Sequence, residues 1–64
     1  MIDEVIKFGN GNVMVFDEKG EQMPQYQGRY DAVKAKILAH APGSAKFFHS
    51  VWAASLDPVE RKEW

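Results

Sequence analysis

The 64-residue sequence predicts a single small α+β domain, residues 1–64, in which an antiparallel hairpin or meander of two or three strands precedes two helices and a short third helix. Three observations predict this class. Two β-prone runs near the N-terminus flank an Asn-Gly pair, one helical apolar stripe fills the middle of the chain, and a Pro-Gly break follows it. Strands that precede helices along the chain are typical of α+β domains.

The N-terminal hairpin is predicted from the runs 5–8 and 12–17, which an Asn-Gly turn can join. In the second run, apolar side chains alternate toward both faces of the strand. Such a strand is either central and covered on both sides, or covered by the helix on one side and by a second copy of the protein on the other. A turn at 17–20 and a short third strand at 21–27 complete the meander, and Pro24 restricts that strand to an edge.

The central helix is predicted within residues 28–41, where the large apolar residues follow the spacing of one helical face. These residues are Tyr30, Val33, Ile37, Leu38 and Ala41. The helix should end near His40, because a residue that precedes a proline, here Pro42, disfavours helical conformation. We expect the apolar stripe to cover the hairpin.

Two further helices are expected after the Pro-Gly break. Ser44 can cap a second helix over 45–54. The residues at its buried spacing are Phe47, Phe48, Val51, Trp52 and Ser55. Asp57, Pro58 and Glu60 then provide a cap, a proline at the first helical position and an acid at the third, which predict a short C-terminal helix.

The charge distribution says more than the net charge of −1. Residues 1–27 carry a balance of −3 and residues 28–49 one of +3, so the two parts either complement each other or offer a basic face to a partner. Zero cysteines exclude disulfides and thiolate metal sites. No apolar run approaches the roughly 20 residues that a membrane span needs, and the N-terminus does not resemble a signal peptide. We therefore expect a cytoplasmic protein without membrane contact.

No catalytic, cofactor or metal site is predicted. His40 and His49 stand nine residues apart across the Pro-Gly break, which is not the spacing at which one helix binds zinc. The sequence has no nucleophile elbow and no glycine-rich phosphate loop. So short a chain has difficulty enclosing a pocket of about 300 Å3, and we expect no enzyme.

The aromatic content favours a non-enzymatic protein–protein interaction domain, possible homodimers included. Aromatic side chains dominate binding hot spots, and this chain has more of them than two strands and two helices need to close a core. The candidate contact residues are Phe47, Phe48, Trp52, Trp64 and Tyr26. The alternative is a weak nucleic-acid-binding module that uses a basic face of residues 28–49. Its candidate phosphate contacts are Arg29, Lys34, Lys36 and Lys46.

Overall fold

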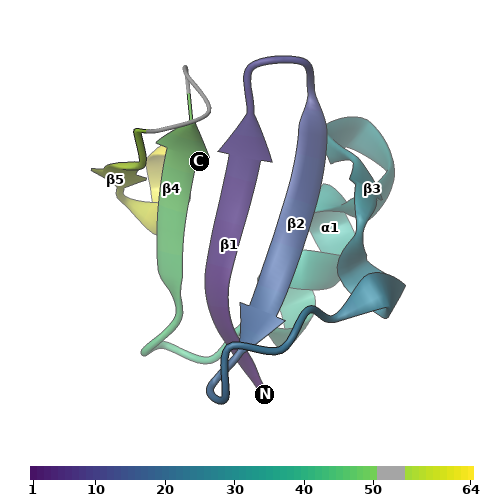
Figure 1. Ribbon diagram of the computed structural model, residues 1–64, viewed down its shortest axis with the longest axis vertical. Helices are drawn as coiled ribbons and strands as arrows, with labels where there is room; N and C mark the ends of the chain where they lie inside the picture. Colours follow the sequence, from purple (N-terminus) through teal and green to yellow (C-terminus); the bar gives the residue numbers. More distant parts are fainter. Residues whose placement is uncertain (51–54) are drawn as a thin grey trace.

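The computed structural model describes residues 1–50 and 55–64, which form a five-stranded mixed sheet with one α-helix behind it (Figure 1). The class is α+β. The strand order across the sheet is β3-β2-β1-β4-β5, with β1 and β4 parallel and every other neighbouring pair antiparallel. The strands are β1 (Ile2–Phe8), β2 (Asn12–Asp17), β3 (Gly28–Arg29), β4 (Lys46–Ser50) and β5 (Asp57–Val59).

Strands β1 and β2 form the N-terminal hairpin. Gly11 closes it with a positive φ of 88°, and its N–H donates to the carbonyl of Phe8 at 3.0 Å. The register shifts between Ile2 and Glu4, so β1 contains a bulge near its start. Because a bulge reverses the alternation of side chains, Ile2 joins the same buried cluster as Val5, although the two residues are an odd number of positions apart.

Helix α1 (Tyr30–His40) lies on one face of the sheet and buries Val33 and Ile37 against it. Ala41 has extended dihedral angles, φ −72° and ψ 126°, and follows the last helical residue, His40. The following proline explains this end, because its ring excludes helical conformation at Ala41.

The predicted second helix over 45–54 is wrong in the part that the structure describes. Residues Lys46–Ser50 form β4, which pairs in parallel with β1 through Ile6 and Phe48 among others. Phe47 and Phe48 therefore point to opposite faces of the sheet and do not share one broad helical side. Val51 and Trp52 lie outside the described residues.

The predicted C-terminal helix is also wrong. Asp57–Val59 form the edge strand β5, and a single 3-10 turn, η2 (Arg61–Glu63), follows it. Proline is tolerated in an edge strand because its missing N–H costs no ladder hydrogen bond on the outer side, so Pro58 fits β5 as well as it fits a helix start.

The predicted third strand at 21–27 is replaced by smaller elements. Gln22 makes one isolated bridge to Phe16, and Pro24–Tyr26 form a 3-10 turn, η1. The strand that pairs with β2 on this side is β3, two residues long.

The core lies between the sheet and α1, and it includes the last residue of the sequence. Trp64 is 3% exposed and packs against Phe47 with 5.1 Å between ring centroids and against Tyr30 with 5.0 Å. The buried cluster consists of Ile2, Val5, Val13, Val15, Val33, Ile37, Ala41, Phe47 and Trp64. The described residues contain no helix with the length and apolar character of a membrane span.

Candidate protein-interaction surface

The two faces of the sheet differ in what covers them. Residues paired in register point to the same face, so Val5, Val15 and Phe47 share one side, and all three belong to the buried cluster under α1. Figure 1 shows α1 and the C-terminal turn behind the sheet, with no described helix or strand over the near side. We call this near side the open face.

The open face is apolar. Its central row crosses four strands, because Ile6 pairs with Met14 of β2 and with Phe48 of β4, and Phe48 pairs with Pro58 of β5. Phe8 and Phe16 extend it on either side along the strands. The six apolar residues of the open face are Ile6, Phe8, Met14, Phe16, Phe48 and Pro58, and none of them belongs to the core cluster or packs against it.

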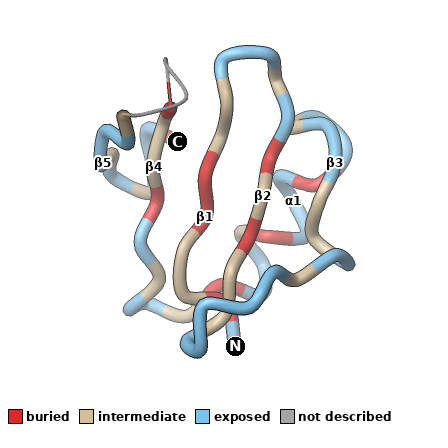
Figure 2. Tube along the Cα trace, in the orientation of Figure 1, coloured by how far each residue is buried: buried red, intermediate tan, exposed pale blue. Residues whose placement is uncertain are grey.

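The residues of the open face differ in exposure. Ile6, in the middle, is 8% exposed, whereas Met14 and Phe48 on either side of it are partly exposed. Figure 2 shows the buried and partly exposed positions interspersed along β1, β2 and β4. One face of an antiparallel sheet is commonly solvated and polar, so the apolar open face is a candidate contact surface.

Two opposite charges lie side by side at one end of the open face. Glu4 pairs in register with Phe16 on one side and with Lys46 on the other. Lys46 is exposed and Glu4 partly so, and within the described residues neither forms an ion pair. Both charges are therefore available to a partner.

The structure separates the five aromatic candidates. Phe47 and Trp64 are each 3% exposed and belong to the core, and the hydroxyl of Tyr30 donates to the Trp64 carbonyl at 2.6 Å. Tyr26 packs against the same core, and its hydroxyl lies 2.9 Å from His40 Nδ1. Phe48 lies on the open face, and Trp52 is outside the described residues.

The four basic candidates are not brought to one surface. Lys46 lies on the open face, whereas Lys34 and Lys36 belong to the helix behind the sheet. Lys36 donates to the carbonyl of Gln25 at 2.6 Å, and Arg29 donates across the hairpin turn to a carbonyl 3.2 Å away. This placement gives no continuous phosphate-binding stripe among the described residues.

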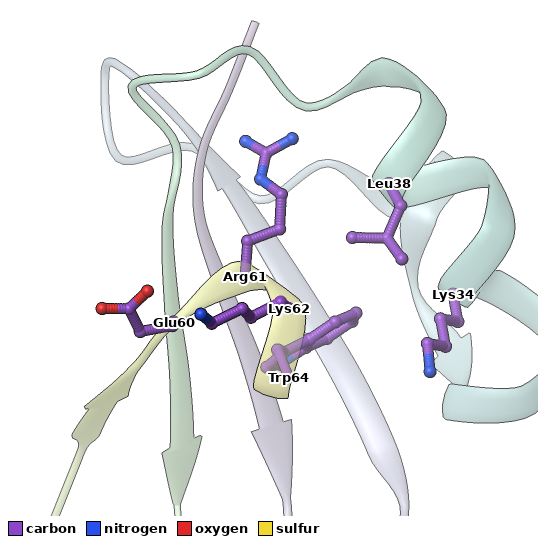
Figure 3. A pocket seen from close by; sticks show the side chains of 6 residues that line it. All are labelled: Lys34, Leu38, Glu60, Arg61, Lys62 and Trp64. Carbon is purple, nitrogen blue, oxygen red and sulfur yellow. The ribbon is translucent and has the colours of Figure 1, made fainter.

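A hollow lies on the far side, between α1 and the C-terminal turn (Figure 3). Its volume of about 540 Å3 exceeds what we expected of so short a chain. Its cations are largely committed elsewhere: Arg61 donates to the carbonyls of Ala41 and Pro42, and the Lys34 ammonium lies 5.0 Å from the centre of the Tyr30 ring. The hollow is lined by the apolar side chains of Leu38 and Trp64, and Glu60 and Lys62 complete its lining.

The described residues show no cluster of three histidine, cysteine or acidic side chains suited to a metal ion. The one carboxylate with a clearly shifted pKa is structural. Asp17 accepts the backbone N–H groups of Glu21 and Lys19, each at 2.9 Å, and the bond from Glu21 chiefly holds its pKa below the ordinary 3.8. This carboxylate stabilises the turn that follows β2.

Comparison of the chain with protein-family models, curated proteins and solved structures finds no match. The open-face residues Ile6, Met14 and Phe16 were absent from the candidates that the sequence suggested. A signal for Met14 and Phe16 did exist, since apolar residues on both sides of 12–17 predicted a strand covered on both faces, by the rest of the chain or by the helix and a second copy.

Proposed function

We propose that this chain is a small, non-enzymatic protein-interaction domain that binds its partner through the open face of the sheet. The supporting observation is the apolar row of Met14, Ile6, Phe48 and Pro58, which crosses four strands with no described element over it. The opposite face of strands β1, β2 and β4 packs in the core under α1, which keeps the backbone that carries this row in place. A rigid surface loses little conformational entropy when it binds.

The composition of the open face suits a protein partner. Phenylalanine and methionine are enriched at the buried centre of protein interfaces, and charged groups are more frequent at the rim. Phe48 and Met14 occupy the centre here, and Glu4 and Lys46 lie toward one end. Covering apolar surface contributes about 25 cal/mol for each Å2 removed from water, and the free-energy cost of association is smaller when the side chains are already fixed in place.

The test is site-specific photocross-linking in cells that express the chain. A benzophenone amino acid replaces Phe48 on the open face in one variant and Ala35 on the exposed side of α1 in the matched control. We expect one defined protein product from position 48, identified by mass spectrometry, and its loss when Met14→Asp is added. Equal or absent products at positions 48 and 35 would refute the proposed function.

A further inference from the structure

We infer that the partner of the open face is a second copy of this chain, docked about a two-fold axis that runs along the strands between β1 and β4. This inference rests on the proposed function and names the partner. Two sheets stack face to face about 10 Å apart with their strands roughly aligned. A two-fold axis in this position lays β1 of each copy over β4 of the other.

The charges of the open face select this axis. Glu4 and Lys46 are in-register neighbours on β1 and β4, so the axis between these strands brings Glu4 of each copy to Lys46 of the other. The contact forms twice, because a two-fold interface is reciprocal. In the same arrangement Ile6 of each copy packs over Phe48 of the other, so the apolar rows of the two copies cover each other.

Other axes through the same face are unfavourable. An axis along β1 sets Glu4 over its own copy, and an axis along β4 does the same to Lys46, so each opposes like charges. An axis across the strands through Ile6 places Glu4 over Phe8 and Lys46 over Ser50 at the opposite end of the face, where each charge loses water without meeting an opposite charge. The alignment between β1 and β4 satisfies both the charges and the apolar row.

The size of the face predicts a weak dimer. The Cα atoms span 26 and 23 Å in the plane of Figure 1. The footprint per copy is therefore at most roughly 600 Å2, which places the interface at or below the lower end of specific protein contacts. We therefore expect association at micromolar to millimolar concentration and a monomer at high dilution.

The experiment is sedimentation equilibrium of the purified chain from micromolar to millimolar concentration. The variants are Glu4→Lys, Lys46→Glu, their equimolar mixture, and the charge-matched controls Glu63→Lys and Lys62→Glu on the exposed C-terminal turn. Each reversal alone opposes like charges twice in the dimer, so we expect its dimer dissociation constant to rise about tenfold or more. In the mixture, lysine at position 4 of one chain meets glutamate at position 46 of the other, and the heterodimer should form with the affinity of the original dimer.

The mixture separates contacts between chains from effects within one chain. Glu4→Lys also sets two lysines side by side within one sheet, and mixing does not relieve that repulsion. Circular dichroism confirms that each variant is folded, and the double variant E4K/K46E restores both kinds of contact if a single reversal does not fold. A chain that stays monomeric at millimolar concentration overturns the inference, as does a dimer that the mixture fails to restore. If the protein cross-linked through position 48 is a different protein, the proposed function stands. Only the identification of the partner as a second copy is then refuted.

Discussion

Replacement of Trp64 by alanine should remove most of the stability of this domain. The side chain is 3% exposed and contacts the rings of Phe47 and Tyr30, which come from β4 and α1. The Tyr30 hydroxyl also donates to the Trp64 carbonyl at 2.6 Å. The last residue of the sequence therefore joins the helix to the sheet, and its loss leaves a cavity between them.

The size of the effect follows from the buried area. A buried tryptophan covers about 150–250 Å2, and at about 25 cal/mol per Å2 its removal costs roughly 4–6 kcal/mol. Substitutions of buried aromatic residues by alanine cost about 3–5 kcal/mol. A chain of 64 residues has a total stability of roughly 3–10 kcal/mol, so Trp64→Ala should lose about half of that stability or more.

The assay is urea unfolding followed by far-ultraviolet circular dichroism, because tryptophan fluorescence changes with the substitution itself. Trp64→Phe is the matched variant. The indole Nε1 is buried without a hydrogen-bond partner in the described structure, so phenylalanine removes an unsatisfied donor while it keeps a ring against Phe47. We expect Trp64→Phe to cost about 1 kcal/mol or less. A loss below about 1 kcal/mol for Trp64→Ala would show that the C-terminus does not dock.

Three further predictions concern residues outside the open face that stabilise the fold. Gly28→Ala should cost about 1–3 kcal/mol in thermal unfolding, because Gly28 has a φ of 140°, which is strained for a residue with a Cβ even though the space beside Val33 would admit one; an unchanged melting temperature would contradict this. Asp17 binds its proton less readily in the folded state than in the unfolded state, so its contribution is present at neutral pH and is lost as the pH falls through 3.8 and below. The free energy of unfolding of Asp17→Asn should therefore decrease less at acidic pH than that of the original chain. An equal decrease in the two proteins would argue against this role. Arg61→Ala should cost about 1–3 kcal/mol in urea unfolding because two carbonyls beyond α1 lose their donor, and Lys62→Ala, at an exposed neighbouring position, should cost nearly nothing.

The sequence predicted the elements that depend on residues close together in the chain. Asn-Gly between two β-prone runs predicted the β1–β2 hairpin, and the spacing from Val33 to Ile37 predicted α1 with its end at His40. These signals are local because a turn glycine and a helical stripe act within a few residues. The remaining elements depend on partners far away in the chain.

Strand β4 shows why the C-terminal part was predicted wrongly. Phe47 and Phe48 with the following apolar residues fit a helical spacing, and a short apolar run does not by itself distinguish a buried strand from a helix. Its strand character comes from pairing with β1, about forty residues earlier, and from the Pro-Gly break that lets the chain return beside it. Asp57-Pro58 was ambiguous in the same way, because one signature serves a helix start and an edge strand.

The candidate surface was partly predictable. Phe48 was named from the sequence for its aromatic side chain, and the two apolar sides of β2 implied a second contact layer. The sequence did not place Phe47 and Phe48 on different faces, because that requires knowing that β4 is a strand. Glu4 and Lys46 become neighbours only through the parallel pairing of β1 with β4.

The two edge strands determine how such domains can assemble. Strand β3 has two residues and β5 has three, one of them Pro58, which lacks a backbone donor. Neither edge offers the long row of free N–H and C=O groups that would let chains join end to end into a continuous ribbon. In the proposed dimer the open face of each copy is covered by the other, so assembly would stop at two copies and would not continue into a fibre.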